Sequence, residues 1–415
     1  MQRRSVAKLL AMGAGAQLIG DTETGEAANA EAAEAVEAVE AVEAVDPAAE
    51  VAADLSKAVV IDDYAELSRK KLPRPTWEYI STGCEGEVTL RDNIEAFRRI
   101  GVLPPILHGV SKADLSTTVL GQKIAMPVML APVAGLRMYH PDGALASARA
   151  ARAAGTICAV SSSAFHSAEE IGAAGDGPKW FQIYMPKDLG LAKALIERVE
   201  AAGFKAIVVT VDLGERKDAD RRNKFGVPKE MLLKHLRDIG HRQLHDGMSQ
   251  AEIEAFNQGA WQLSMSWDII DWLRGITRLP LVVKGILGIP DARQAVKENA
   301  DAIVVSNHGG RRLDGMPASI DQMQLVADAV NGKTELLLDS GIRRGTDVMK
   351  ALALGARAVL VGRAQAWSLA TAGEAGVRQM LEYLRQELEM AMVSCGCPDV
   401  DAISADLLLN KPTAG

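Results

Sequence analysis

The sequence predicts an α/β fold whose strands form a closed parallel barrel. Beyond residue 120, eight short apolar runs alternate with amphipathic segments, and Gly, Pro, Asp or Ser separates them. The runs are apolar almost throughout, which is typical of parallel strands buried on both faces by helical crossovers. Polar residues end nearly all of them. These observations favour a (β/α)₈ TIM barrel over a doubly wound open sheet, which would gather its polar strand ends at one switch point.

The candidate strands are residues 128–133, 156–162, 179–185, 206–212, 281–286, 302–308, 335–341 and 358–363. Helical patterns lie between them at 141–154, 189–202, 289–298, 320–330 and 346–354, and several end close to a glycine, as helices commonly do.

The connection between the fourth and fifth strands, residues 213–265, is far longer than an ordinary barrel loop and rich in charge. An insertion at this place predicts a lid over the catalytic mouth. His235, His241 and His245 fall inside it. They have neither cysteine neighbours nor a fixed ligand spacing, so we expect surface residues and no metal site.

Composition excludes several functions for this 415-residue chain. Its net charge of -8 and pI near 5.5 offer no basic face for a phosphate backbone, so we do not expect nucleic-acid binding. The four cysteines lack CxxC spacing and are too few to cross-link so long a chain, which predicts buried thiols. No glycine-rich dinucleotide fingerprint follows the first strand, so NAD is not expected.

The first sixty residues differ from the rest. Arg3 and Arg4 precede an apolar stretch and a small-x-small triplet, so residues 1–30 resemble a twin-arginine export signal, which implies a periplasmic protein. The alternative is a frayed terminus on a cytoplasmic protein. Residues 31–60 are rich in Ala, Glu and Val and predict a solvated linker. The barrel domain is then residues 61–415.

Side chains at the strand ends carry the candidate chemistry, because such positions converge on one mouth of a barrel. A single Ser or Asp at a strand end is more often a helix cap, but seven successive strands ending this way are not well explained by caps. The positions are Ser161, Ser162, Gln182, Tyr184, Thr210, Asp212, Lys284, Ser306, Asn307, His308, Asp339, Gly362 and Arg363.

The segment from Ser306 to Gly315, SNHGGRRLDG, resembles the FMN-dependent 2-hydroxy-acid dehydrogenase family, which includes glycolate oxidase, lactate oxidase, mandelate dehydrogenase and flavocytochrome b2. Further blocks at 79–97, 279–285 and 339–345 extend the similarity from Tyr64 to about Ile403. Gly310, Gly315 and Ser340 place it nearest the lactate oxidase branch.

The resemblance implies a catalytic role for His308 as the base and for Asp212 as its orienting carboxylate. Arg311 matches the arginine that binds the substrate carboxylate, and Tyr79 and Tyr184 match substrate-binding hydroxyls. The family has a second arginine after the fourth strand. The loop here is shorter, and either Arg216, which we favour, or Lys217 takes that position.

The resemblance also implies FMN and a set of residues that bind it. The backbone of Ala131, Pro132, Val133 and Ala134 would lie against the flavin, with Lys284 beside its N1 and O2. Arg343, Gly362 and Arg363 would bind the phosphate and Asp339 the ribityl chain. The remaining expected cofactor contacts are Ser161, Gln182, Thr210 and Ser306.

The expected function is oxidation of an L-2-hydroxy acid to the 2-oxo acid, followed by re-oxidation by oxygen, a quinone or a cytochrome. Ser163 stands where glycolate oxidases have a bulky aromatic residue, which predicts a substrate as large as lactate or larger. The family often forms tetramers, so a homo-oligomer is expected. The alternatives are a non-catalytic FMN-binding barrel and another FMN barrel enzyme such as an isomerase.

The export hypothesis predicts that changing both arginines to lysine, Arg3→Lys with Arg4→Lys, retains the protein in the cytoplasm. Fractionation of cells that express the parent or the double variant measures this. Equal periplasmic amounts of the two would contradict the assignment of residues 1–30.

Overall fold

The computed structural model describes residues 47–213 and 226–411. The predicted export signal and most of the predicted linker lie outside these ranges. The chain divides into a unit of residues 1–52 and a unit of residues 53–415, and the second unit contains the barrel described below.

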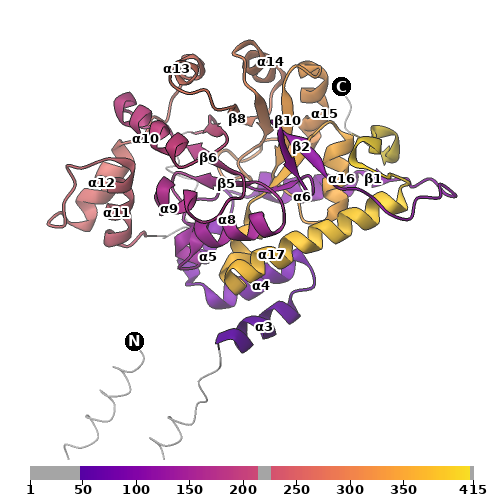
Figure 1. Ribbon diagram of the computed structural model, residues 1–415, viewed down its shortest axis with the longest axis horizontal. Coiled ribbons are helices and arrows are strands. Elements are labelled where there is room, and N and C mark those ends of the chain that lie inside the picture. The colour runs from indigo at the N-terminus through magenta and orange to yellow at the C-terminus, as the bar shows by residue number, and fades with distance from the viewer. Residues whose placement is uncertain (1–46, 214–225, 412–415) are drawn as a thin grey trace, which may run out of the picture. The chain divides into compact units, whose positions relative to one another are not determined.

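Eight parallel strands form a closed barrel, and each lies within one of the eight predicted strands, so the predicted fold is confirmed (Figure 1). Around the barrel their order is β4, β5, β6, β7, β8, β9, β10 and β11, which is their order along the chain. Their bounds are Val128–Leu130, Cys158–Ser161, Lys179–Ile183, Ile207–Thr210, Leu281–Ile286, Ala302–Val305, Glu335–Asp339 and Ala358–Val361.

Along each strand, residues that face the barrel interior alternate with residues that face the surrounding helices. In β6, Trp180 belongs to the interior cluster, whereas Phe181 and Ile183 belong to the outer one. The lower interior is apolar, with residues such as Val208, Val282 and Leu337. The same alternation continues to the carboxyl ends of the strands. In most strands, the last residue that faces the interior is therefore one of the polar strand-end residues identified in the sequence.

Helices follow the strands and cover the barrel, as predicted for five of them to within about two residues at each end. Within the described residues, no helix is long and apolar enough to cross a membrane. The helices after strands are α7 Leu136–Tyr139, α8 Gly143–Ala153, α9 Ala168–Gly172, α10 Leu189–Ala201, α13 Asp268–Ile276, α14 Ile289–Lys297, α15 Ser319–Val330, α16 Gly345–Ala353 and α17 Arg363–Ser394. Helix α17 is interrupted at Ala372 and Gly373, whose backbone is not helical.

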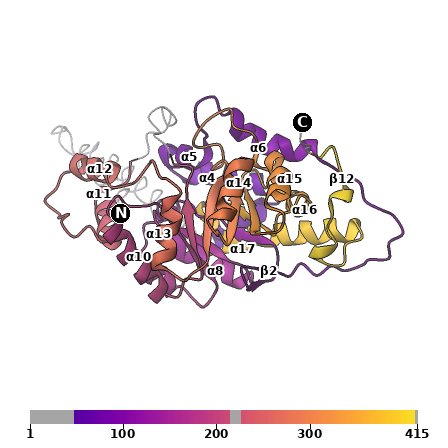
Figure 2. The same ribbon diagram turned by 90° about the horizontal axis from the view of Figure 1, so that it is seen from above.

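The segment before the barrel contributes helices, a hairpin and one strand of a second small sheet, whose other strand lies near the end of the described residues. These are α4 Ile61–Lys71, α5 Arg74–Ser81 and α6 Val88–Arg99, the hairpin of β2 Thr117–Val119 and β3 Gln122–Ile124, and the pair of β1 Gly101–Val102 and β12 Leu408–Leu409. The hairpin closes the lower end of the barrel, because Val119 and Ile124 join its interior cluster and Trp180 Nε1 donates to Gln122 Oε1 at 3.2 Å. The chain between β1 and β2 projects from the barrel (Figure 2).

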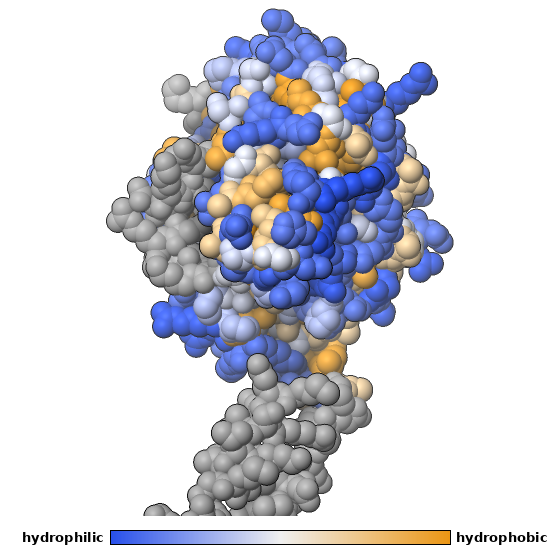
Figure 3. All heavy atoms as spheres, turned by 90° about the vertical axis from the view of Figure 1, so that its left-hand side faces the viewer, coloured by the Kyte–Doolittle hydropathy of each residue, from blue (hydrophilic) through white to orange (hydrophobic). Residues whose placement is uncertain are grey.

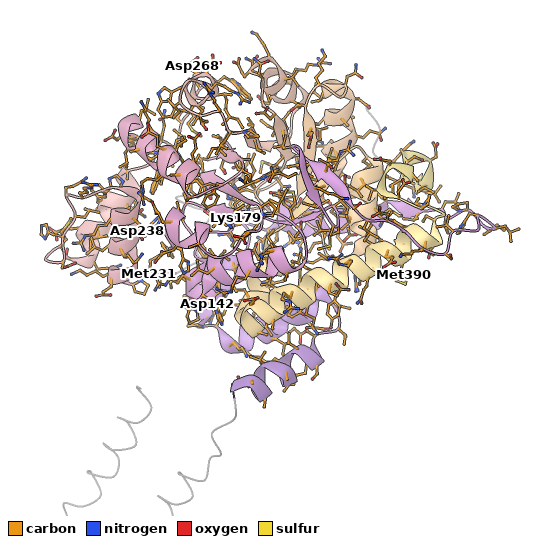
Figure 4. The ribbon with its side chains drawn as sticks, in the orientation of Figure 1. Asp142, Lys179, Met231, Asp238, Asp268 and Met390 are labelled. Carbon is orange, nitrogen blue, oxygen red and sulfur yellow. The ribbon has the colours of Figure 1, made fainter. Side chains whose placement is uncertain are left out.

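The insertion after β7 contains α11 Lys229–Ile239 and α12 Gln250–Gly259, whose apolar residues form a small cluster with Phe165. Met231 and Asp238 of α11 lie far from Met390 near the end of α17 (Figure 4). The face that carries α11 and α12 is mostly hydrophilic, with hydrophobic patches between (Figure 3).

Two histidines of this insertion correct the sequence prediction of surface positions. His235 and His241 are only 4% and 8% exposed, and each packs edge-on against a phenylalanine, Phe165 and Phe256 respectively. His235 is buried because it shares the apolar face of α11 with leucines, and burial lowers its pKa to about 3. His245 is exposed, as predicted.

The predicted linker also ends sooner than residue 60, because α3 covers Pro47–Lys57. The segment begins with proline, has Glu50 in its first turn and Lys57 in its last, and is rich in alanine, all of which favour a helix. All four cysteines are buried free thiols, as predicted.

The contact between α16 and α17 predicts that Gly345 tolerates no side chain. A Cβ atom there would collide with the backbone of Glu387 and Leu388. Gly345→Ala should therefore lower the free energy of unfolding by about 1–3 kcal/mol, as overpacking does. Gly275→Ala is the matched control: nothing lies within 4 Å of its Cβ position in α13, so stability should stay level or rise slightly. Thermal denaturation of both variants tests this, and equal melting temperatures would contradict it.

Candidate active site

A cavity opens at the carboxyl ends of the barrel strands, where the sequence predicted the site. Its walls come from Lys284 of β8, from the ends of β10 and β11, from the segments after β4, β6, β9, β10 and β11, and from α5. The predicted site residues that line it are Tyr79, 131–134, Tyr184, Lys284, His308, Arg311, Asp339, Arg343, Gly362 and Arg363. Ser161, Gln182, Thr210 and Ser306 are buried at the ends of their strands. Arg216 and Lys217 lie outside the described residues.

The strand register brings the buried polar residues into one layer. Ser161 is paired with Gln182 across β5 and β6, and Thr210 with Lys284 across β7 and β8. By the alternation of the strands, all four face the barrel interior above the apolar layers. The cavity therefore lies over a polar layer instead of an apolar one.

His308 and Asp212 form a hydrogen-bonded pair at this mouth, with 2.9 Å between His308 Nδ1 and Asp212 Oδ1. Burial lowers the pKa of His308 to about 3, so the imidazole is neutral near pH 7. Burial alone would raise the pKa of Asp212, but attraction to His308 and the hydrogen bond from it bring that pKa to about 2. Because Asp212 is ionised and can only accept, Nδ1 carries the hydrogen and Nε2 carries a lone pair.

A β-bulge in β8 makes room for Asp212. The register between β8 and β9 shifts between Lys284 and Ile286, and Gly285 between them has φ +115°. A Cβ atom on Gly285 would come within 2.7 Å of Asp212 Cβ and Cγ. Only glycine therefore allows the carboxylate to reach His308.

The chain around His308 is held in an unusual backbone conformation. His308, Gly309 and Gly310 have φ values of 57°, 68° and 69° in succession. The His308 N–H donates to Ser306 Oγ at 3.0 Å, and Gly310 approaches α6 so closely that a Cβ would lie 2.7 Å from Leu90 N. This run of left-handed residues explains the two glycines of the motif.

Reciprocal side-chain bonds tie the same loop to the entry segment. Asn93 Nδ2 donates to Asn307 Oδ1 at 2.9 Å, and Asn307 Nδ2 donates to Asn93 Oδ1 at 2.7 Å. Asp314 Oδ1 accepts from the N–H of Thr89 at 2.9 Å. The loop and α6 thus hold each other in place.

Lys284 is a buried cation in the polar layer. Its Nζ lies 3.0 Å from Asp339 Oδ2 and donates to Ser306 Oγ at 3.0 Å. Burial would lower its pKa, but the carboxylates of Asp339 and Asp212 raise it overall, so the amine stays charged. Gln182 is 1% exposed, and neither atom of its amide has a protein partner among the described residues. Such a buried group indicates a missing polar ligand.

Two arginines after β10 and β11 reach the cavity. Arg363 begins α17 and donates to the carbonyl oxygens of Ile80, Gly309 and Thr82 at 2.9–3.0 Å. Burial and the neighbouring arginines hold its pKa well below the usual value. The guanidinium carbon of Arg343 lies 5.0 Å from the centre of the Trp367 ring. Arg363 thus joins three segments of the chain as well as lining the cavity.

Arg311 lies against the entry segment. Its Nη1 donates to the carbonyl oxygens of Tyr79 and Thr82 at 2.5 and 3.2 Å, and its guanidinium carbon lies 4.9 Å from the centre of the Tyr79 ring. Tyr184 also lines the cavity, and burial raises the pKa of its phenol, which stays protonated and able to donate.

Sequence reasoning missed two residues of the site, Gly285 and Arg312. Arg312 Nη2 lies 3.4 Å from His308 Nε2. Their signals were weak, since Gly285 follows a strand-end lysine and Arg312 merely adjoins the arginine that the motif assigns. Within the described residues, no group of three His, Cys, Asp or Glu side chains could hold a metal ion.

A second cavity, of about 320 Å³, adjoins the first and shares Tyr79, Ala134, Tyr184 and Arg312 with it. Its other walls come from the segment after β5 and from the insertion that contains α11 and α12. They are largely apolar and include Ser163, Phe165, Val227, Leu232, Trp261 and Leu263.

Comparison with known proteins identifies the family. Residues 68–410 match the family model described as FMN-dependent dehydrogenase. The chain is 46% identical to glycolate oxidase 3 of Arabidopsis thaliana, over 82% of this chain and 93% of that one, and 43% identical to 2-hydroxyacid oxidase 1 of Homo sapiens, over 87% and 99%. A crystal structure of mandelate oxidase superposes with a TM-score of 0.74 at 39% identity, over 85% and 98%. The chain therefore belongs to the FMN-dependent 2-hydroxy-acid oxidase family, and its cofactor is FMN.

Proposed function

We propose that this protein oxidises an L-2-hydroxy acid, with a side chain as large as that of lactate or larger, to the 2-oxo acid. The observation that carries the proposal is the neutral His308 imidazole, whose Nδ1 donates to Asp212 and whose Nε2 faces a cavity with cationic walls. A 2-hydroxy acid needs a base for its hydroxyl proton and a cation for its carboxylate. The site offers both within one mouth.

The residues around the first cavity fit FMN. The buried amide of Gln182, which has no protein partner among the described residues, suits the polar edge of the flavin. The charged Lys284 would stabilise negative charge on the reduced ring. The backbone of 131–134 would hold the ring, Asp339 the ribityl chain, and Arg343 and Arg363 the phosphate. When bound, FMN would supply the acceptor for the two electrons that leave the substrate together with the carbinol hydrogen.

The protein's own residues then handle the proton and the carboxylate. His308 Nε2 accepts the proton of the substrate hydroxyl, and Asp212 stabilises the imidazolium that forms, because its carboxylate is fixed 2.9 Å from Nδ1. Tyr79 and Tyr184, which both line the cavity, hold the substrate, and Arg311 attracts its carboxylate.

The second cavity supports the substrate size. Ser163 contributes only a small side chain to a wall that otherwise consists of residues such as Phe165, Trp261 and Leu263. An apolar side chain on the substrate could therefore extend from the reaction site toward the insertion. Because residues of the insertion form part of the wall of this cavity, we assign the insertion the role of a lid. Structures of mandelate oxidase with (S)-mandelic acid and with (S)-4-hydroxymandelic acid, both aromatic 2-hydroxy acids, support a substrate of this size.

We further propose a homotetramer and periplasmic action, with oxygen or a respiratory carrier as acceptor. Ile106 and Leu107, in the projecting loop of Figure 2, are 83% and 98% exposed, and such apolar residues favour contact with another subunit. The location rests on the sequence of residues 1–30.

The test is stopped-flow reduction of the purified yellow protein by a panel of L-2-hydroxy acids. We expect lactate and larger acids to reduce the flavin with a higher second-order rate constant than glycolate, because burial of each extra methylene contributes about 0.8 kcal/mol. Re-oxidation by air or by a dye then separates oxidase from dehydrogenase.

Ser163→Phe provides the matched variant. Its ring would occupy the second cavity, so the preference should shift toward glycolate while glycolate itself reacts at the parent rate. Failure of every acid to reduce the flavin would contradict the proposed function, whereas a parent preference for glycolate would contradict only the substrate size.

A further inference from the structure

Arg312 occupies a position in the site that no part of the mechanism above uses. Its Nη2 lies 3.4 Å from His308 Nε2, the nitrogen that must accept the substrate proton. It also lines both cavities, together with Tyr79 and Tyr184. The side chain therefore lies where the reaction site meets the space for the substrate side chain.

The tautomer of His308 determines which atom donates and which accepts in the contact between Arg312 and His308. Nδ1 donates its hydrogen to Asp212, so Nε2 can only accept, and a guanidinium can only donate. In the ligand-free site, Arg312 therefore donates toward the lone pair of the base. That lone pair must become available before the base can act on a hydroxyl group.

A 2-hydroxy acid offers the guanidinium a better acceptor at the same place. Its carboxylate is one carbon–carbon bond away from the carbinol, so a cation beside the base is also beside the carboxylate. A hydrogen bond from a cation to a carboxylate is stronger than one to a neutral nitrogen. Arg311 has part of its donor capacity committed, since Nη1 donates to the carbonyls of Tyr79 and Thr82.

We propose that Arg312 binds the substrate carboxylate, and that in the absence of substrate it covers Nε2 of His308. The inference rests on the proposed function and adds Arg312 to its carboxylate-binding residues. Substrate binding and exposure of the base are then one event, because the same guanidinium leaves Nε2 when it engages the carboxylate.

The charges around Arg312 agree with this position. Its positive charge lowers the pKa values of Tyr184, Asp212 and His308, while burial is the largest influence on each. Among the described residues, the groups that feel this charge are a carboxylate already bonded to His308, a phenol and the neutral base.

The test compares each acid with its amide, which lacks the negative charge. Arg312→Gln should weaken binding of the 2-oxo acid product, measured by calorimetry on the oxidised FMN-bound protein, by about 10- to 100-fold, as expected for a hydrogen bond to a charged group. Binding of the 2-oxo amide should change by less than about threefold. Arg312→Lys should recover part of the loss, since it keeps the charge but not the paired geometry.

Arg278→Gln is the control, because it removes the same charge from an exposed position before β8. It should leave both affinities at the parent value. Unchanged acid binding in Arg312→Gln would overturn the proposal, and so would an equal loss for acid and amide, which would mean that Arg312 acts only through the base or the fold. Because binding is measured without turnover, this result stands apart from whether any 2-hydroxy acid reduces the flavin.

Discussion

The site depends on one hydrogen bond, from His308 Nδ1 to the Asp212 carboxylate. It joins the carboxyl ends of β9 and β7, which are not neighbouring strands. The chain at both ends must therefore be held in a particular conformation. On one side, the bulge at Gly285 leaves room for the carboxylate. On the other, a run of left-handed residues beginning at His308 turns the ring toward it, and Asn93 with Asn307 holds that turn. The bond fixes the tautomer, and the tautomer makes Nε2 a base.

A polar layer above an apolar barrel interior gives this bond its electrostatic setting. Lys284, Asp339 and Ser306 satisfy one another there, so a buried cation can persist where an unpaired one would be costly. Gln182 is the exception, since its buried amide has no protein partner among the described residues. Burial keeps His308 neutral well below the ordinary imidazole pKa of 6.5. Burial of these polar groups lowers the stability of the fold, but it also keeps His308 neutral and leaves Gln182 available to a ligand.

Much of this was predictable from sequence, for identifiable reasons. Strands buried on both faces are apolar runs in the sequence, so all eight were predicted. A closed barrel brings the carboxyl ends of its strands together whatever the conformation of the loops, so most site residues could be predicted as well. Long-range pairing leaves no local pattern, which is why β1 with β12 was missed. His235 and His241 were misplaced because burial against Phe165 and Phe256 depends on tertiary packing. Arg312 was overlooked because only the backbone turn at 308–310 brings its side chain beside the base.

The most direct test of the account is the rate of flavin reduction in His308→Gln, measured by stopped flow with the best L-2-hydroxy acid. Glutamine keeps a polar side chain but cannot take the proton, so reduction should slow by about 10²- to 10⁴-fold while the protein stays yellow. In the parent, the rate should stay level as the pH falls through 6.5, because burial lowers the pKa of His308 and the base remains neutral. A variant that keeps FMN and is reduced as fast as the parent would contradict the assignment of His308 as the base.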